Sequence, residues 1–305
     1  MHDDPELRTG VVTAFTAYVV WGLLTLYWKQ LDDFEAFELV GWRVTSAAVI
    51  MAVATTATGG WGRLRSVARD PRLLGRVACA AVLLTGNWCA YVWAVVHGNV
   101  IETSLGYFMA PLGTMAFGVV AFGEHLDRAQ RIAIGFAVLA VAVLVVSYGE
   151  VPWIALVLAS SWSVYGVLKK RVPLSATESM SAETLVVLLP AIAVVVATSG
   201  RAGSVPSTAS AADAVLVALT GVATVVPLML FARAAHRVPL TILGPMQYLI
   251  PTINFLLGWL VFDEALPPSR VAGFALVWCG LVVMTAGTLR RRSKRARTRQ
   301  RAVVV

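Results

Sequence analysis

The sequence is poor in charge. Only 14% of its 305 residues are Asp, Glu, Lys or Arg, and 58% are hydrophobic, whereas a soluble domain has about 25% charged and about 45–50% apolar residues. This composition excludes a disordered chain, a collagen-like chain and a nucleic-acid-binding protein with a strongly charged surface, so we expect no nucleic-acid partner. It is typical of a membrane protein, and the lipid bilayer is the first partner that we predict.

The sequence also has few residues that could perform catalysis or hold a metal. Its three cysteines, Cys79, Cys89 and Cys279, lie singly inside apolar runs, where cysteine packs as a small hydrophobic residue. No Walker, Gly-x-Ser-x-Gly or His-Glu-x-x-His sequence occurs, which argues against an ATP-driven pump and against the enzymes that those motifs mark. We therefore predict no enzyme activity, no metal and no cofactor. Two alternatives to transport stay open: a membrane-embedded lipid-modifying enzyme, and a membrane sensor that transports nothing.

Long apolar runs fill most of the chain. A helix needs roughly 20 apolar residues to cross a bilayer core about 30 Å thick. The runs are continuous rather than alternating, which predicts helices and not the strands of a barrel. The ten predicted spans are Thr9–Trp28, Ala36–Thr56, Val77–Val96, Thr103–Phe122, Gln130–Ser147, Pro152–Leu168, Ala182–Thr198, Ala211–Ala232, Thr241–Phe262 and Val271–Leu289.

The basic residues orient these spans. With the N-terminus in the cytoplasm, 21 of the 25 Lys and Arg residues fall in cytoplasmic segments, and Lys29, Arg201 and Arg270 fall outside. Cytoplasmic segments of membrane proteins are enriched in Lys and Arg. The sequence therefore predicts both termini in the cytoplasm, with residues 1–8 as an N-terminal tail and residues 290–305 as a basic tail. We interpret the basic tail as a stop-transfer anchor that becomes disordered, in preference to a site for anionic lipid.

The chain repeats itself at half its length. Pro111 and Gly118 are matched by Pro251 and Gly258, both at the same offset along the chain. That offset also joins Phe122 with Phe262, Glu124 with Glu264, and Leu126 with Leu266. The two predicted halves, residues 9–149 and 150–289, have five spans each, an odd number, so the second half enters the membrane inverted. Inverted repeats of this kind are the plan of many secondary transporters.

Three stretches carry a resemblance to a known family: Gly86–Val95, Glu102–Leu112 and Gln247–Thr252. They resemble the RarD permeases, a branch of the EamA family in the drug/metabolite transporter superfamily, over about residues 10–288. The resemblance implies a multi-pass protein of the bacterial inner membrane, with ten helices in two inverted five-helix EamA repeats. It also implies secondary-active transport of a small organic metabolite or drug-like solute by alternating access, with export favoured over import. The oligomeric state stays open, and a homodimer is one alternative.

Arg43 is the clearest candidate for a solute contact. It lies seven residues into the second span, about 10 Å from the outer end at 1.5 Å per residue. One interpretation is a contact with an anion or carbonyl of the solute. The other is a structural arginine that reaches toward the interface and pairs with Glu38 or Glu102. Glu102 is also a candidate proton site, although pairing with an arginine would keep it ionised near neutral pH.

The third span predicts one wall of a cavity. Asn87, Trp88 and Tyr91 lie on neighbouring helical faces, and aromatic walls with one amide suit an amphipathic organic solute. By contrast, we assign Trp28, Trp61 and Trp153 to the aromatic belts at the membrane surface. The further candidates for the cavity are Ser104, Tyr107, Trp162, Tyr165, Gln247, Tyr248 and Asn254.

Pro111 and Pro251 lie near the middle of the fourth and ninth predicted spans. A proline inside a helix removes the hydrogen bond to the carbonyl four residues earlier, here that of Tyr107 or Gln247. Freed carbonyls inside a membrane need protein or water as partners. We predict helix bends at both prolines that flank the solute path, with a simple kink between packed helices as the alternative.

Overall fold

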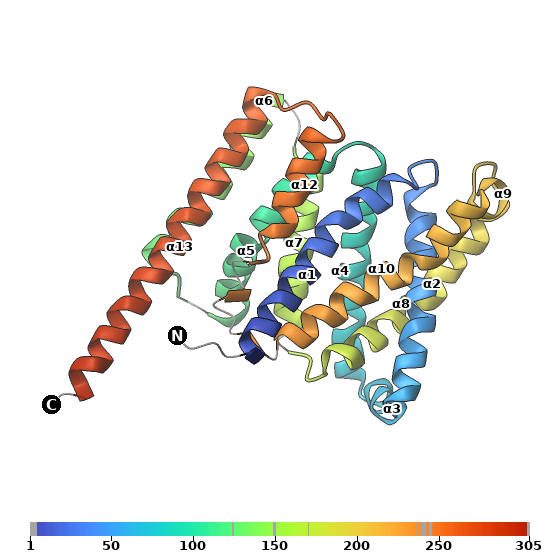
Figure 1. Ribbon diagram of the computed structural model, residues 1–305, viewed down its shortest axis with the longest axis horizontal. Coiled ribbons are helices and arrows are strands. Elements are labelled where there is room, and N and C mark those ends of the chain that lie inside the picture. Colours follow the sequence, from blue (N-terminus) through green and yellow to red (C-terminus); the bar gives the residue numbers. More distant parts are fainter. Residues whose placement is uncertain are drawn as a thin grey trace.

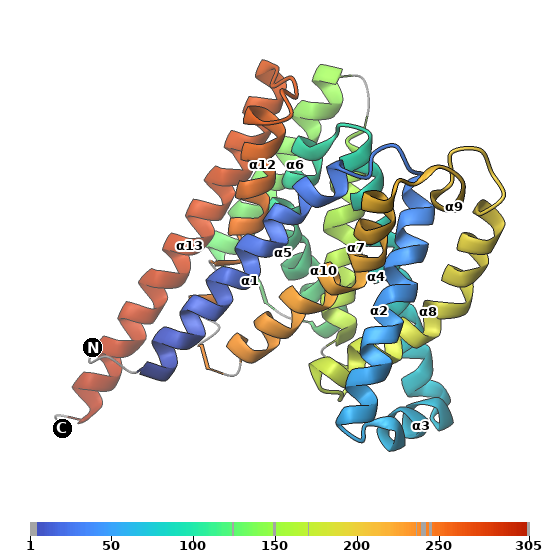
Figure 2. The same ribbon diagram turned by 45° about the vertical axis from the view of Figure 1, so that its right-hand side comes forward.

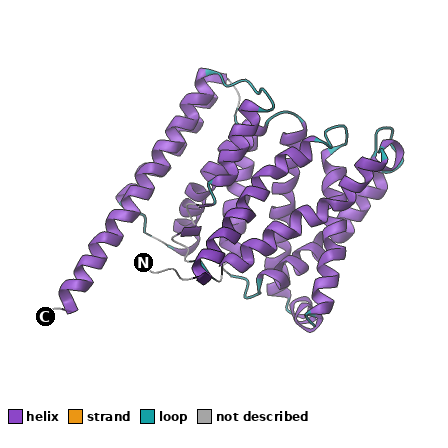
Figure 3. Ribbon diagram, viewed as in Figure 1, coloured by secondary structure: helices purple, strands orange, loops and turns teal. Residues whose placement is uncertain are grey.

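The chain is almost entirely helical. The computed structural model describes residues 5–123, 125–148, 151–169, 171–235, 237–238, 242–243 and 246–303, and within these ranges it contains helices and no strand (Figure 3). The predicted all-α class is therefore confirmed. The helices are α1 (Pro5–Lys29), α2 (Ala36–Ala57), α3 (Trp61–Arg69), α4 (Pro71–Val96), α5 (Val100–Phe122), α6 (Arg128–Tyr148), α7 (Trp153–Lys169), α8 (Ala176–Thr198), α9 (Val205–Thr208), α10 (Ala211–Ala235), α12 (Leu249–Leu260) and α13 (Pro268–Val303).

Eight of these helices are long and apolar enough to cross a membrane: α1, α2, α4, α5, α6, α8, α10 and α13. Two shorter helices, α7 and α12, are also apolar. Each of the ten predicted spans overlaps one of these helices, while the number of crossings stays a prediction.

The helix ends gather at two opposite ends of the molecule (Figure 1). We call them the α3 end and the α9 end, after the short helix that lies at each. α6 and α13 pack along each other at one edge of the molecule, and they stay side by side when the view is turned (Figure 2).

The two halves pack with a two-fold pseudo-symmetry. Each of three helices contacts its repeat counterpart: α2 with α8, α5 with α12, and α6 with α13. Contacts between non-equivalent helices also come in matching pairs, such as α1 with α10 and α4 with α7. Thr55 near the end of α2 bonds to Ser181 near the start of α8 (2.9 Å), while Glu38 near the start of α2 accepts from the backbone N–H of Val205, beyond the end of α8. The counterparts therefore run antiparallel, and the repeat is inverted.

Glycines allow close contact where helices of different halves cross. A Cβ added at Gly106 of α5 would lie 2.9 Å from the carbonyl oxygen of Ala155, and one at Gly113 would lie 2.5 Å from the Ser163 hydroxyl, both on α7. At Gly221 of α10 the added atom would lie 2.5 Å from backbone atoms of α2. Small residues let helix backbones approach closely, which is how membrane helices gain packing energy.

α4 and α8 begin well before their predicted starts at Val77 and Ala182 because the first turn of each is capped. Asp70 accepts hydrogen bonds from the first N–H groups of α4, and Pro71 follows it at the first helical position, where its missing N–H has no cost. Ser175 and Glu178 form a capping box that starts α8 at Ala176 rather than Ala182. Hydropathy detects the apolar part of a helix, so it predicts a helix start that lies after a polar first turn.

The ninth predicted span and the tail differ from the predictions. α12 begins at Leu249, after a turn at residues 247–248, so Pro251 lies in the first helical turn and does not bend the middle of a helix. Pro111, in contrast, lies inside the continuous α5. The basic tail continues α13 as a helix to Val303 instead of losing its structure. The repeat-related Glu124 lies outside the described residues.

Candidate functional site

Arg43 is buried between aromatic rings in the half of the molecule toward the α9 end. Its Nε donates to the hydroxyl of Thr224 on α10 (2.8 Å). The guanidinium carbon lies 4.0 Å from the ring centre of Trp88 on α4 and 5.3 Å from that of Trp28 on α1, within the range of a cation–π interaction. Only 3% of Arg43 is exposed. The arginine is therefore held by a hydroxyl and by ring faces.

The predicted ion pair of Arg43 does not form. Glu38 accepts hydrogen bonds from the indole N–H of Trp42 and the backbone N–H of Val205, and Glu102 accepts from backbone N–H groups of α7. Among the described residues, neither carboxylate forms an ion pair with Arg43. The assignment of Trp28 to a membrane-surface belt is also wrong, because this ring is 1% exposed and lies beside Arg43. Trp61 and Trp153 are exposed, and their assignment to such a belt stays a prediction.

A second group of buried polar atoms joins α1, α4 and α12. The hydroxyl of Thr25 donates to Oδ1 of Asn254 (2.8 Å) and shares a 2.8 Å hydrogen bond with the hydroxyl of Tyr91. Thr25 and Trp28 lie three residues apart on one face of α1, and Trp88 and Tyr91 do so on α4. The Thr25 group and the Arg43 group therefore share the same two helix faces.

Asn87 anchors a third group, on α4, α5 and α7. Its amide nitrogen donates to the carbonyl of Leu158 (3.2 Å) and to the hydroxyl of Ser161 (2.9 Å). Its oxygen accepts from the hydroxyl of Tyr107 (3.0 Å). The Tyr107 ring lies 5.9 Å from that of Tyr91 and 6.4 Å from that of Trp162, measured between ring centres. The aromatic wall predicted for the third span therefore exists, and α5 and α7 extend it.

Hydrogen-bond donors outnumber acceptors in this region. The indole N–H of Trp28 and the amide nitrogen of Asn254 are buried and have no acceptor among the described residues. Arg43 adds a guanidinium, a group that carries five N–H donors and no acceptor. A buried donor without a partner costs about 1–3 kcal/mol, so the arrangement favours a ligand that supplies acceptor oxygens.

Three carboxylates stabilise the starts of other helices instead of facing this region. Glu264, after α12, accepts from the first backbone N–H groups of α5, at Val100 (2.6 Å) and Ile101 (2.8 Å). Glu102 accepts from Ile154 N–H (3.1 Å) in the first turn of α7, and Glu38 accepts from Val205 N–H at the start of α9. Burial raises the pKa of the Glu264 carboxyl above its ordinary value, and the two backbone N–H groups oppose this effect. These carboxylates complement the positive ends of helix dipoles.

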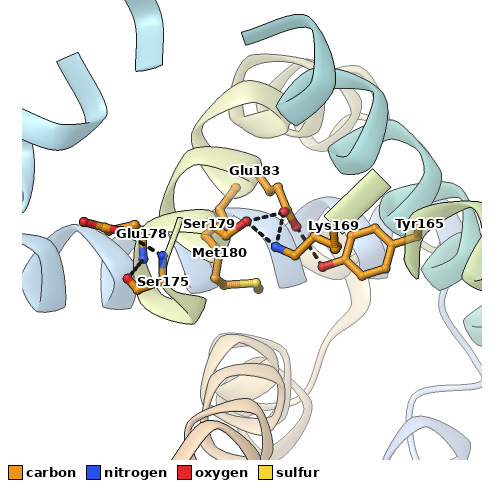
Figure 4. Close-up of polar contacts among 8 residues, drawn as sticks. Tyr165, Lys169, Ser175, Glu178, Ser179, Met180 and Glu183 are labelled. Atoms are coloured by element: carbon orange, nitrogen blue, oxygen red, sulfur yellow. Dashed lines mark hydrogen bonds and ion pairs between the residues drawn. The ribbon is translucent and has the colours of Figure 1, made fainter. Parts of the chain in front are cut away.

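A buried ion pair lies toward the α3 end, between α7 and α8 (Figure 4). Nζ of Lys169 lies 2.7 Å from Oε1 of Glu183 and also donates to the hydroxyl of Ser179. Ser179 donates to the same carboxylate oxygen (2.8 Å), and the hydroxyl of Tyr165 donates to the other (3.1 Å). Glu183 is 3% exposed, whereas 30% of the Lys169 side chain is exposed. The carboxylate is thus satisfied entirely by side chains.

Several predicted site residues lie apart from the Arg43 region. Ser104 donates to the carbonyl of Pro251 (2.7 Å) and joins α5 to α12. Tyr248 stacks on Phe108 in a separate aromatic cluster with Phe274 and Trp278, and Gln247 is exposed.

Two cavities of about 220 Å³ each occur near the ends of the molecule. The cavity at the α9 end is lined by residues that include Trp93, Glu102, Trp153 and Arg270. The cavity at the α3 end is lined by residues that include Thr55 and Glu178. Neither of these two cavities is lined by Arg43, Asn87 or Tyr107.

Several residues of these groups are not predicted as site residues from the sequence: Thr25, Trp28, Ser161, Lys169, Ser179, Glu183 and Thr224. The hydroxyl-bearing residues carry no motif, because a threonine in an apolar helix usually bonds to its own backbone. Glu183 could have been found from the repeat, since the offset from Arg43 to Glu183 is the one that relates Pro111 to Pro251.

Comparison with known proteins gives consistent matches along the whole chain. Residues 8–146 and 151–286 each match the EamA-like transporter family. Protein RarD of Streptomyces exfoliatus is 43% identical over 302 residues, which is 99% of this chain and 96% of that protein. Protein RarD of Escherichia coli (strain K12) is 33% identical over 300 residues, covering 96% of this chain and 100% of that protein.

Two further matches agree with these. The uncharacterized transporter YojE of Bacillus subtilis (strain 168) is 34% identical over 285 residues, covering 92% of this chain and 94% of that protein. A protein of known crystal structure, 20% identical, matches with a TM-score of 0.58 over 92% of this chain and 98% of its own. At that identity, the structural match supports the fold alone.

Proposed function

Because this chain belongs to the RarD branch of the EamA-like transporter family, whose members are multi-pass transporters of the bacterial inner membrane, we propose that it is a secondary-active permease for a small organic solute. The proposal includes ten crossings, with α7 and α12 completing the eight longer helices, and places both termini and the α3 end in the cytoplasm. It treats residues 9–149 and 150–289 as the two repeat units. Export is the proposed direction, by analogy with the drug/metabolite transporter group.

The excess of buried donors carries the proposal for the solute. Arg43, the indole of Trp28 and the amide of Asn254 offer N–H groups in one region, and no carboxylate pairs with Arg43 among the described residues. A carboxylate or carbonyl on the solute would supply the missing acceptors. The rings of Trp88 and Tyr91 would contact its apolar part.

The position of these groups supports alternating access. Arg43 to Thr224, Thr25 to Asn254, and Asn87 to Ser161 are all hydrogen bonds from the first repeat to the second. Relative movement of the halves would break such bonds. A solute that replaces them in one conformation favours that conformation by its differential contacts. The buried polar groups at the interface of the repeats therefore suit a site that opens to each side in turn.

Flux into and out of proteoliposomes tests this proposal. The panel contains aliphatic and aromatic carboxylates, with ammonium-bearing solutes of the same size as the comparison. We expect carboxylates to be transported and Arg43→Ala to lose roughly 10- to 100-fold of that flux, the equivalent of a charge-assisted hydrogen bond of about 1.5–3 kcal/mol. Arg43→Lys should recover part of the flux. Arg201→Ala, which removes an exposed arginine between α8 and α9, is the matched control and should retain it.

The same vesicles separate the alternatives. Wild-type flux in Arg43→Ala would overturn the site assignment. Chemically altered vesicle lipids without solute flux would support a lipid-modifying enzyme, and solute binding without flux would support a sensor.

A further inference from the structure

The buried ion pair occupies the repeat position equivalent to Arg43. The helix caps Glu35 and Ser175 are repeat counterparts that start α2 and α8. Arg43 and Glu183, related by the same offset, are each the eighth residue of their helix. Since the repeat is inverted, Arg43 lies toward the α9 end and Glu183 toward the α3 end. Two buried charges of opposite sign thus occupy equivalent places in the two halves.

Glu183 differs in what holds it from Glu38, which is also buried, and from Glu102 and Glu264, which are half-buried. Glu38, Glu102 and Glu264 accept hydrogen bonds from backbone N–H groups at helix starts, and these donors move only if a whole helix moves. Glu183 has side-chain partners, and two of them, Lys169 and Tyr165, belong to α7. A change of rotamer at Lys169 is enough to remove its cation.

Lys169 is the charged group that faces Glu183 among the described residues. α8 packs against α2, α3, α4 and α10. The charged side chains of those helices and of α8 itself have other partners or are exposed. Glu38 accepts from the backbone of Val205, and Arg43 donates to Thr224. Arg63 and Arg76 donate to the backbone carbonyls of Pro173 and Arg171, respectively, while Asp213 and Glu178 cap the starts of their own helices. The remaining charged residues are exposed: Arg65, Arg69, Arg72 and Arg233. Tyr165 is the other titratable group in contact.

We propose that Glu183 is a proton-binding site that couples transport to the proton gradient, with the ammonium of Lys169 and a proton competing for the same carboxylate. This inference rests on the proposed transport function. In the conformation described here, Lys169 neutralises Glu183. When α7 and α8 separate, the carboxylate would remain among apolar helices without a cation, an arrangement that is costly within a membrane. A proton from the water that reaches Lys169 then binds to Oε1, and Lys169 keeps its own charge.

Ring contacts connect this site to the solute region. The ring centres of Tyr165 and Trp162 lie 5.8 Å apart, and that of Trp162 lies 6.4 Å from Tyr107, which donates to Asn87. α7 therefore carries contacts to both Glu183 and the aromatic wall. A displacement of α7 that exposes Glu183 also moves that wall, which supplies the coupling between the two sites.

Infrared spectroscopy of the protein in lipid nanodiscs tests proton binding without any solute. Lys169→Met removes the competing cation, so we expect a carboxylic-acid C=O band at neutral pH that the wild type lacks. The band should be absent from the Lys169→Met, Glu183→Gln double variant and from Lys169→Arg, which keeps a cation. Glu178→Gln is the matched control on the same helix. Adding it to Lys169→Met should leave the band unchanged, because Glu178 bonds to Ser175 at the start of α8. Absence of the band in Lys169→Met, or its persistence in the double variant, would overturn the proposal.

A flux measurement distinguishes failure of the coupling site from failure of the proposed function. In proteoliposomes with an imposed pH gradient, Glu183→Gln should still equilibrate a carboxylate solute but should lose the acceleration by the gradient. Gradient-driven flux in this variant would overturn the coupling site and leave transport intact. Absence of flux for every solute in the wild type would overturn the transport function, whereas the infrared result would still report on Glu183.

Discussion

The buried Glu38 and the half-buried Glu102 and Glu264 accept hydrogen bonds from backbone N–H groups of other helices. None of the three forms an ion pair with a basic side chain among the described residues. The first N–H groups of a helix have no partner within it, and inside or near a bilayer no water replaces that partner at low cost. Each of these carboxylates therefore satisfies a helix start and fixes its neighbour. Glu102 is predicted from the sequence as a candidate solute contact because a distant backbone donor leaves no trace in the sequence.

At Glu264 this arrangement predicts a dependence of stability on pH. Burial raises the pKa of Glu264 above the ordinary 4.5, so the folded protein holds this proton more tightly than the unfolded chain does. The stabilisation from the protonated form is complete below 4.5 and is lost as the pH rises through the pKa of the folded state. Glu264→Gln cannot ionise and should lack this loss.

Thermal unfolding in detergent between about pH 4 and about pH 8 measures the effect, in a range where carboxyl groups titrate. The unfolding midpoint of the wild type minus that of Glu264→Gln should decrease as the pH rises. An increase over the same range would contradict the assigned direction of the pKa.

At the scale of the helices, hydropathy and charge located the elements but not all of their starts. The predicted start of α8 at Ala182 is late because Ser175 and Glu178 make its first turn polar, whereas these two residues form the capping box of the helix. The start of α12 was displaced because an apolar run continues across the turn at residues 247–248. Charges that are satisfied inside a bundle are invisible to a test based on composition. Glu183 is such a charge, and for this reason it is not predicted as a site residue from the sequence.

The crossing of α10 over α2 predicts a strong effect of one methyl group. A Cβ at Gly221 would lie 2.5 Å from the backbone nitrogen of Ala47 and the backbone carbon of Ser46, so Gly221→Ala should force the two helices apart and destabilise the protein by about 1–3 kcal/mol. Gly86→Ala is the matched control, because no atom lies within 4 Å of its added Cβ. Its greater helix propensity should be neutral or stabilising by up to about 1 kcal/mol. Unfolding midpoints in detergent compare the two, and equal midpoints would contradict this account of the packing.

At the scale of the whole molecule, the constant offset between matching residues of the two halves predicted the inverted repeat from sequence. It could not predict which side chains meet across the two halves, because Thr25 and Asn254 or Arg43 and Thr224 are far apart in the chain and carry no shared pattern. The pairing of helices follows from symmetry, while the polar contacts follow from the register of each helix pair. A shift of one residue would rotate each side chain by about 100° around its helix.

The proposed topology predicts the location of reporter fusions. The distribution of basic residues predicts a cytoplasmic C-terminus. A fluorescent protein fused after Val305 should therefore fluoresce, and a phosphatase that needs oxidation should be inactive there. The same phosphatase inserted after Gly203, between α8 and α9, should be active. A phosphatase active at the C-terminus and inactive after Gly203 would overturn the orientation.

The opposite charges of Arg43 and Glu183 make the two ends of the inverted repeat electrostatically different. If both halves carried the same charge at this position, turning the molecule over in the membrane would leave the same charge at both positions. Because Arg43 lies toward one end and Glu183 toward the other, inverting the molecule exchanges the positions of the positive and the negative charge, although the helices of the two halves superimpose. A duplicated chain of this kind can exchange the shapes of its halves during a cycle without making its two directions of transport equivalent.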